Sequence, residues 1–428
     1  MSGSWPLTAS MLHSIGFSMQ SKFGVLVRQR ADQAAQLFLV VLAFSVATST
    51  SLLSVSAILV VLCWSVSGRL RESGREIVAN PVSRAILVYV LLLVVGLFWT
   101  ENLENGLEVI KDRWKIMLMP IFLTVVSSRR RHWYAIAFVA GICAAMGIGY
   151  LAFFDLLHYQ DMGPEHLTRR TFHVVYNPLL AFAIYLVAHA AIWGRQRPVC
   201  RGFLGVLVVV MVVNMFITEG RIGQLAFFVL STLLLLQFFR RRLAGVLLSI
   251  VLVPLLFFMG YQLSPVFKAR VDLACQEIQQ FDVNPATSVG YRLLYWKNSL
   301  QIIRQAPFFG VGTGDFIDAY ADVNRQESPD IAPTDNPHNQ YLLVLSQFGL
   351  LGALVFASLF FVLFRQAVVL PHDGWQRIRF AFPVLFLTIM LTESYLVVYE
   401  TGFLFSLFAA ILYKMPEDVS VFPGNPRK

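Results

Sequence analysis

The chain has 428 residues, of which 57% are hydrophobic and only 14% are charged, and its mean hydropathy is +0.65. A water-soluble core cannot use that much apolar sequence, so the composition excludes an ordinary soluble enzyme and indicates a polytopic membrane protein. The formal net charge of +9 does not predict a nucleic-acid partner, because the basic residues fall between apolar runs, where they mark membrane topology.

Apolar runs near the length of a membrane span recur along the chain and predict an all-α fold with about twelve transmembrane helices. The runs cover residues 33–50, 52–67, 83–99, 115–127, 132–154, 173–193, 202–218, 222–239, 243–261, 338–364, 378–392 and 396–413. The fourth run and the last two are short for a span, so their ends are the least defined.

Arginine clusters lie in alternate connections between these runs, which predicts that those connections and both termini are cytoplasmic. The clusters are at residues 28–30, 69–84, 129–131, 195–201, 240–242 and 365–379. No cleavable signal sequence is evident in the first thirty residues, so the first span is expected to direct insertion. Only Cys275 of the four cysteines falls on the outer side, which leaves no disulfide framework there.

The same topology divides the chain into five parts. They are a cytoplasmic tail at residues 1–30, nine helices at 31–260, an outer loop at 261–337, three helices at 338–413 and a cytoplasmic tail at 414–428.

The outer loop after the fifth span is rich in acids and histidines but has no recognised zinc spacing. These residues are Asp155, His158, Asp161, Glu165 and His166. Arg169, Arg170 and His173 follow at the outer mouth of the sixth helix, where they are secondary candidates for a phosphate contact.

Arg221 lies in a very short outer turn between two strongly apolar helices, on the side where topology does not favour arginine. One interpretation is that it reaches the membrane surface and pairs with Glu219. The other is functional, because a planar guanidinium at an interface is well matched to a diphosphate group.

The outer segment 261–337 is too long for a simple connection and is expected to be partly helical. Apolar residues recur at helical spacing from residue 291 to 305, with Arg292 near the start of the predicted helix. The glycine-rich stretch 309–316 lacks the ending of a nucleotide loop, so no ATP site is predicted. A tight turn packed against the bundle is the preferred interpretation, with a backbone nest for phosphate as the alternative.

His338 follows this segment at the start of a hydrophobic helix. Pro337 suits the first helical position and Asn336 or Asp335 the cap, which predicts that His338 lies in the first turn of a helix running on through Leu350. The positive end of the helix favours neutral imidazole, the form that accepts a proton. A histidine that is only a polar tip at the water interface is the alternative.

Ionisable residues that topology does not explain collect at the outer mouths of the helices, and Glu393 in the last outer turn is a candidate to orient His338. A transporter more often has charges or broken helices at the middle of the bilayer, together with repeats of one half in the other. The distribution therefore favours chemistry at the outer membrane face.

Three motifs together resemble the bacterial O-antigen ligase family. They are Tyr291-Arg292 followed by Trp296 and Pro307, the stretch from Gly310 to Phe316, and the stretch from His338 to Leu342, in an arrangement of about twelve helices with a long outer loop late in the chain. The resemblance is concentrated between Arg221 and Gly352 and is shared with O-antigen polymerases and protein O-oligosaccharyltransferases.

The resemblance implies a class C glycosyltransferase-like membrane fold that moves O-antigen from undecaprenyl diphosphate to a sugar hydroxyl of lipid A-core, at the periplasmic side of a bacterial inner membrane. His338 matches the essential loop histidine of the family, Arg221 and Arg292 match its two arginines, and Glu393 is the candidate for its acidic residue.

We hypothesise from this a direct, inverting displacement with His338 as base and the two arginines on the departing diphosphate, requiring no cofactor, metal ion or ATP. The alternatives are an O-antigen polymerase, a protein O-oligosaccharyltransferase or a lipid-linked oligosaccharide flippase.

Overall fold

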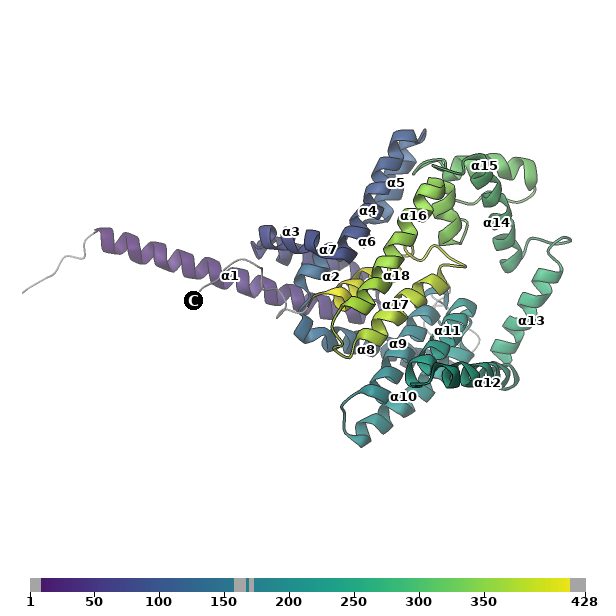
Figure 1. The fold of residues 1–428 in the computed structure, drawn as a ribbon, viewed down its shortest axis with the longest axis horizontal. Helices are drawn as coiled ribbons and strands as arrows, with labels where there is room; N and C mark the ends of the chain where they lie inside the picture. Colours follow the sequence, from purple (N-terminus) through teal and green to yellow (C-terminus); the bar gives the residue numbers. More distant parts are fainter. Residues whose placement is uncertain (1–8, 158–166, 169–172, 416–428) are drawn as a thin grey trace, which may run out of the picture.

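The computed structural model describes residues 9–157, 167, 168 and 173–415, and every regular element within these ranges is a helix (Figure 1). The first half contains α1 (Ala9–Ser45), α2 (Thr50–Val66), α3 (Leu70–Ala79), α4 (Pro81–Val95), η1 (Gly96–Trp99), α5 (Leu103–Asp112), α6 (Trp114–Met117), α7 (Met119–Val125), η2 (Ser128–Arg130), α8 (Arg131–Phe153), α9 (His173–Trp193) and α10 (Pro198–Ile217). The second half contains α11 (Arg221–Phe238), α12 (Arg242–Leu263), α13 (Pro265–Gln279), α14 (Ser288–Gln305), α15 (Phe316–Glu327), α16 (Gln340–Val369), α17 (Gln376–Ile389) and α18 (Tyr399–Tyr413).

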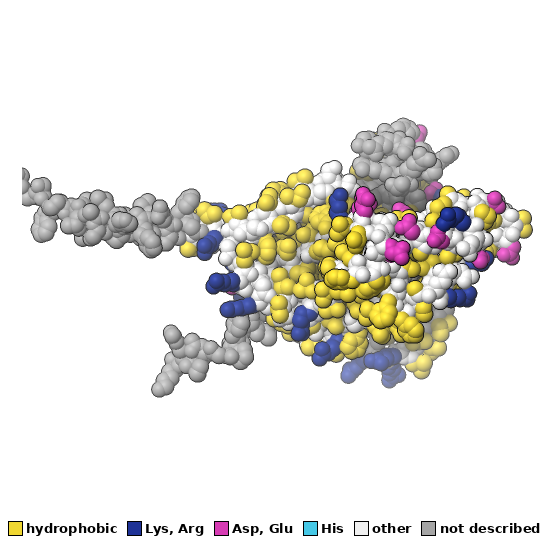
Figure 2. Space-filling view, turned by 90° about the horizontal axis from the view of Figure 1, so that it is seen from above, with side chains coloured by type: hydrophobic (Ala, Val, Ile, Leu, Met, Phe, Trp, Pro, Cys, Tyr) yellow, Lys and Arg dark blue, Asp and Glu magenta, His cyan; other side chains and the backbone are white. Residues whose placement is uncertain are grey.

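The predicted fold class, an all-helical polytopic membrane protein, is confirmed. Each of the twelve apolar runs folds mainly as helix, the fourth as the two short helices α6 and α7, and much of the surface seen in Figure 2 is hydrophobic. Among the described helices, seven are long and apolar enough to cross a membrane, or eight if α2 and α3 form one bent span. The count of twelve crossings therefore stays a prediction.

The last helix, α18, lies at the centre of the bundle although it is short. Every residue from Thr401 to Tyr413 is buried, and the helix packs against α6, α7, α8, α9 and α17. The ring of Phe408 meets the ring of Phe182 at 4.9 Å and that of Phe138 at 5.2 Å, measured between centroids. A helix that is apolar on all sides belongs in a core, so its neighbours rather than lipid surround it.

The long helix α16 is broken at Gly349, which has φ +56° and ψ −147°. The break frees backbone groups that need other partners, because unpaired N–H and C=O groups are costly away from water. The N–H groups of Leu350 and Leu351 donate to the carbonyls of Pro307 and Phe308, at 2.8 and 3.1 Å. In return, the carbonyls of Ser346 and Gln347 accept from the glycine-rich stretch.

The glycine-rich stretch is thereby fixed between α16 and the C-terminal end of α4. Val311 and Gly312 donate to the carbonyls of α16 at 2.9 Å, and the hydroxyl of Thr313 donates to the Leu93 carbonyl at 2.7 Å. Both carboxylate oxygens of Asp315 accept backbone N–H groups from the start of α5. The predicted tight turn packed against the bundle is confirmed.

The segment between α12 and α16 folds as three helices at the right of Figure 1, with α14 and α15 packed on the first part of α16. The helix predicted at residues 291–305 is α14. It begins at Ser288, because the Thr287 hydroxyl accepts the Gly290 N–H and caps the helix there. The end of the bundle at which α16 begins is thus covered by an ordered helical layer.

We expect Gly349→Ala to destabilise the protein more than Gly374→Ala. Both glycines have positive φ, but a Cβ at Gly349 would lie 2.5 Å from the Phe308 backbone, whereas nothing lies within 4 Å of one at Gly374. The backbone strain alone costs about 1–3 kcal/mol, and the clash adds to it at Gly349 only. Thermal unfolding in detergent measures the difference, and equal losses in the two variants would contradict the role given to the break.

Candidate active site

His338 does not lie in the first turn of α16, so that prediction is wrong. The helix begins at Gln340, and its cap is Asn339, whose side-chain oxygen accepts the N–H groups of Tyr341 and Leu342. The Asn339 amide also donates to the Leu391 carbonyl in the turn between α17 and α18, a tertiary contact that selects this asparagine as the cap. His338 precedes the cap with φ +49°, a left-handed conformation that histidine adopts more readily than most residues.

Asn336 holds this conformation instead of capping the helix. Its side-chain oxygen accepts the His338 N–H at 3.0 Å and the Ser394 hydroxyl at 2.8 Å, and its amide donates to Glu393 at 3.0 Å. One asparagine therefore connects the loop around His338, which we call the histidine loop, to the turn between α17 and α18.

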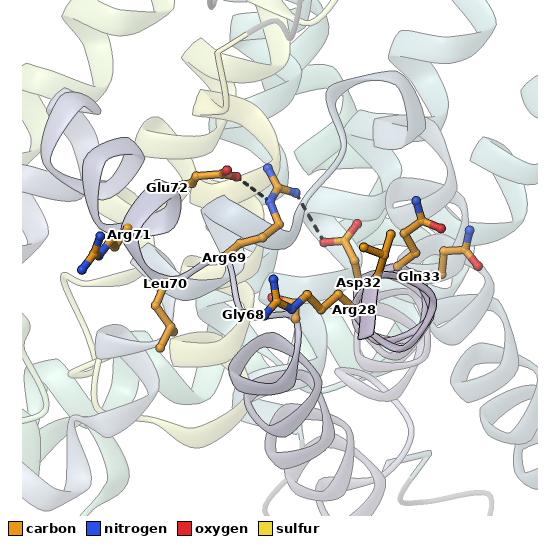
Figure 3. A pocket seen from close by; sticks show the side chains of 11 residues that line it. Arg28, Asp32, Gln33, Gly68, Arg69, Leu70, Arg71 and Glu72 are labelled. Atoms are coloured by element: carbon orange, nitrogen blue, oxygen red, sulfur yellow. Dashed lines mark hydrogen bonds and ion pairs between the residues drawn. The ribbon is translucent and has the colours of Figure 1, made fainter. Parts of the chain in front are cut away.

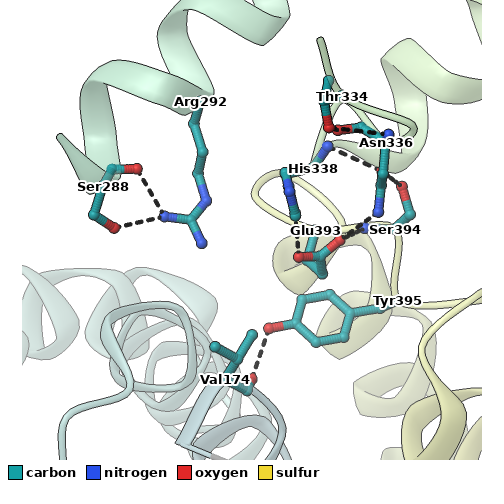
Figure 4. Close-up of polar contacts among 9 residues, drawn as sticks. All are labelled: Val174, Ser288, Arg292, Thr334, Asn336, His338, Glu393, Ser394 and Tyr395. Atoms are coloured by element: carbon teal, nitrogen blue, oxygen red, sulfur yellow. Dashed lines mark hydrogen bonds and ion pairs between the residues drawn. The ribbon is translucent and has the colours of Figure 1, made fainter. Parts of the chain in front are cut away.

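The His338 imidazole points its Nδ1 at a carboxylate oxygen of Glu393, 2.6 Å away (Figure 4). The other Glu393 oxygen accepts the Ser394 N–H at 2.8 Å and the Asn336 amide. The histidine side chain is about one-third exposed, and the glutamate side chain is 9% exposed. The expected contact between these two residues is present. It is made by Nδ1, so Nε2 is the ring nitrogen that Glu393 does not contact.

The Glu393 carboxylate is stabilised in its charged form. Burial acts to raise the pKa of this carboxyl, but the hydrogen bond and charge of His338 act against burial, together with the Ser394 N–H and the charge of Arg292. The net result is a pKa below the ordinary value for glutamate.

Tyr295 of α14 stacks on the His338 ring, with 5.8 Å between ring centroids and 25° between ring planes. Arg292 lies one helical turn before Tyr295 on the same helix, and Figure 4 shows it across from His338 and Glu393 with its guanidinium bonded to Ser288. The histidine and the arginine thus border one space, although they come from different segments.

A cavity of about 270 Å³ opens beside Arg292. Its lining residues come from the starts of α9, α11 and α14, from α13 and from the last outer turn. They are Val174, Glu219, Gly220, Arg221, Ile222, Leu225, Arg270, Ser288, Val289, Arg292, Leu293, Trp296 and Thr392. We call this space the arginine cavity.

Three guanidinium groups surround the arginine cavity. Arg221 pairs with Glu277 at 3.4 Å, Arg270 pairs with Glu219, and Arg292 donates to the backbone and side-chain oxygens of Ser288. The alternative in which Arg221 pairs with Glu219 is wrong, because Arg270 occupies that position.

Two guanidinium nitrogens at this cavity, Nη2 of Arg221 and Nε of Arg292, are buried and have no hydrogen-bond acceptor among the residues that the structure describes. Buried donors are almost always paired in folded proteins, so these two positively charged nitrogens are candidates to donate to an anion in the cavity. The apolar lining of Ile222, Leu225 and Trp296 adds a surface suited to hydrocarbon. The arrangement fits a lipid that carries phosphate.

Sequence reasoning missed Arg270 and Asn336 as parts of the site. Arg270 lies in a polar helix with no motif around it, and Asn336 looks like an ordinary cap residue. Among the secondary candidates, Arg169 and Arg170 lie outside the described residues, as does the side chain of His173. The histidines and acids at residues 158–166 also lie outside the described part of the chain.

The fold and the site define the class: a polytopic membrane protein with a histidine–carboxylate pair beside an arginine-lined cavity at one end of the helical bundle. The sequence model of the O-antigen ligase family matches residues 206–357. This match confirms the resemblance to the O-antigen ligase superfamily that the motifs indicated.

The matched range contains Arg221, Arg270, Arg292 and His338, whereas Glu393 lies beyond it. An uncharacterized protein of Haemophilus influenzae is 26% identical over 252 residues, which is 55% of this chain and 59% of that protein. The aligned part thus covers less than two-thirds of the relative.

We expect Glu393→Gln to destabilise the protein at neutral pH by about 1.5–3 kcal/mol, the usual worth of a hydrogen bond to a charged group. The folded-state pKa of Glu393 is lowered, so the stabilisation is present above the unfolded-state value of about 4.3 and disappears as pH falls through the lower folded-state value. Melting curves of both proteins from pH 7 to pH 3.5 measure this.

The matched control is Glu327→Gln, which breaks only a partly exposed pair with Lys297 on the outer helices and should change stability little. A stability difference between wild type and Glu393→Gln that stays constant down to pH 3.5 would show that the charge of Glu393 does not matter.

Proposed function

We propose that the protein is an O-antigen ligase, which transfers O-antigen polysaccharide from undecaprenyl diphosphate to a sugar hydroxyl of lipid A-core. The observation that supports this most is the placement of the His338–Glu393 pair next to the arginine cavity. A base and an anion site side by side suit a transfer in which an alcohol attacks and a diphosphate leaves.

His338 is the proposed general base. Glu393 accepts the Nδ1–H of the ring, which fixes the tautomer with a free electron pair on Nε2 and stabilises the imidazolium that forms. Nε2 takes the proton of the acceptor hydroxyl as the hydroxyl oxygen forms its bond to the anomeric carbon of the donor. The rigid loop around Asn336 and the stacked Tyr295 hold the ring for this step.

The arginine cavity is the proposed diphosphate site. The bond between the anomeric carbon and the phosphate oxygen breaks with its electron pair moving to the diphosphate, and Arg221, Arg270 and Arg292 stabilise that charge. Attack opposite the leaving group inverts the anomeric configuration. Because three cations face the leaving group, the proposed mechanism uses no metal ion, and the activated donor makes ATP unnecessary.

The same chemistry serves a polymerase or a protein O-oligosaccharyltransferase, which differ only in the acceptor. We place the protein in the bacterial inner membrane with both termini in the cytoplasm and the site facing the periplasm. The arginine clusters in alternate connections support this orientation. A flippase is the less favoured alternative, since transport needs no histidine base.

Deletion of this chain from its bacterium, followed by complementation, tests the proposal. We expect the deletion strain to accumulate full-length polymer on undecaprenyl diphosphate and to carry bare lipid A-core, as seen by gel and lipid analysis. Complementation with the wild-type chain should restore the lipopolysaccharide ladder on the gel. The control variant His372→Ala, which changes an exposed histidine outside the candidate site, should restore it as well. His338→Ala should not, because losing a general base costs about 10²–10⁴-fold in rate.

Other outcomes of this experiment point elsewhere. Core carrying a single repeat unit in the deletion strain would indicate a polymerase, and an unchanged ladder would indicate protein glycosylation or transport. Full activity of His338→Ala at normal membrane levels would contradict the assignment of the base.

We expect Arg270→Ala to reduce kcat/KM for the lipid-linked donor by about ten- to a hundredfold, the loss typical of a hydrogen bond to a charged group. Lys268→Ala is the matched control, because Lys268 lies on the same helix but its ammonium faces the Tyr261 ring outside the cavity. Transfer by purified protein in detergent, at varied donor concentration, gives both values. Equal effects of the two substitutions on kcat/KM would contradict the assignment of Arg270 to the donor site.

A further inference from the structure

A cavity of about 930 Å³ lies between α1 and the bend that joins α2 to α3 (Figure 3). Three arginines and two carboxylates line it, and Arg69 pairs there with Glu72 at 2.9 Å and with Asp32 at 3.7 Å. These charges largely cancel, so the cavity indicates no particular ligand. The side chains around His338 form a more specific arrangement.

Three nearly parallel rings extend from His338 along α14. The ring of Tyr295 stacks on that of His338, with 5.8 Å between centroids and 25° between planes. The ring of Tyr291 stacks in turn on that of Tyr295, at 6.0 Å and 14°. The two tyrosines are four residues apart, which places them on one face of the helix. The row ends in Tyr291, whose side chain is 36% exposed.

The tyrosine face of α14 differs from the face that borders the arginine cavity. Arg292 and Trp296 line that cavity, whereas Tyr291 and Tyr295 do not. One helix therefore presents a cation to the arginine cavity and aromatic rings to the histidine loop.

A carboxylate lies beside these rings. Asp335 belongs to the histidine loop and is exposed. Burial raises the pKa of the Tyr295 hydroxyl, and the charge of the nearby Asp335 acts in the same direction. An aromatic face attracts the C–H groups of a sugar ring, and a carboxylate accepts hydrogen bonds from its hydroxyl groups. The combination therefore suits a sugar.

We propose that Tyr291, Tyr295 and Asp335 form a sugar-binding subsite next to His338, which we call the tyrosine subsite. The inference rests on the proposed function, because that transfer brings two sugars to the histidine. One carries the attacking hydroxyl, and the other has the anomeric carbon that is attacked. A glycan that extends from His338 along α14 meets the exposed ring of Tyr291, while the diphosphate occupies the arginine cavity.

Saturation-transfer NMR of the full-length protein in detergent tests the tyrosine subsite. The probes are the O-antigen oligosaccharide and the core oligosaccharide, each without lipid. We expect wild type and Tyr291→Phe to transfer saturation to the ring protons of a probe. Tyr291→Leu keeps an apolar side chain without a ring and should bind that probe about three- to tenfold more weakly, the usual worth of an aromatic contact. Asp335→Asn should also weaken binding, because a neutral amide is the poorer acceptor.

Phe308→Leu is the matched control, since Phe308 is 65% exposed and follows the opposite end of α14. A loss confined to the O-antigen probe would support a subsite for the donor sugar, and a loss confined to the core probe would support one for the acceptor sugar. Equal binding of both probes by wild type and Tyr291→Leu would overturn the proposal. No saturation transfer in wild type, or an equal loss in Phe308→Leu, would overturn it as well.

This measurement needs no turnover, so it separates the tyrosine subsite from the proposed reaction. A wild-type chain that binds a probe through Tyr291 but does not restore the lipopolysaccharide ladder would support the subsite and contradict the ligase. A chain that restores the ladder equally well with leucine at this position, and binds both probes unchanged, would contradict the subsite alone.

Discussion

The structure depends on one constraint, the need of the α16 backbone for hydrogen-bond partners where the helix breaks. Gly349 interrupts the helix, and the freed groups exchange bonds with Pro307, Phe308 and the glycine-rich stretch. Because unpaired backbone groups are not tolerated in a membrane protein interior, this exchange fixes the outer segment to the bundle. It also orders the first part of α16, directly after the histidine loop.

The candidate site is assembled on that fixed layer from four separate segments. Arg221 begins α11, Arg270 and Arg292 come from the outer helices, His338 precedes α16 and Glu393 lies before α18. None of these residues is placed by its neighbours in sequence alone. The outer segment must therefore be folded against the bundle before these side chains can act together.

The positive charges around the arginine cavity are partly compensated by carboxylates. Glu277 pairs with Arg221 and Glu219 pairs with Arg270, while buried guanidinium nitrogens of Arg221 and Arg292 have no acceptor among the residues that the structure describes. The carboxylates stabilise cations that would otherwise be costly to bury, and they orient the planar forks. In the proposed function, the diphosphate of the donor binds to groups that are already in position.

The sequence by itself determined the fold class, the positions of the apolar helices, the tight glycine-rich turn and the candidates His338, Arg221 and Arg292, because composition, hydropathy and motifs are local properties. It did not determine that Asn339 rather than Asn336 caps α16, that Arg270 joins the cavity or that Glu393 contacts His338 at 2.6 Å. Those features depend on contacts between residues far apart in the chain, such as Asn339 with Leu391 and Arg270 with Glu219, and only tertiary packing brings such partners together.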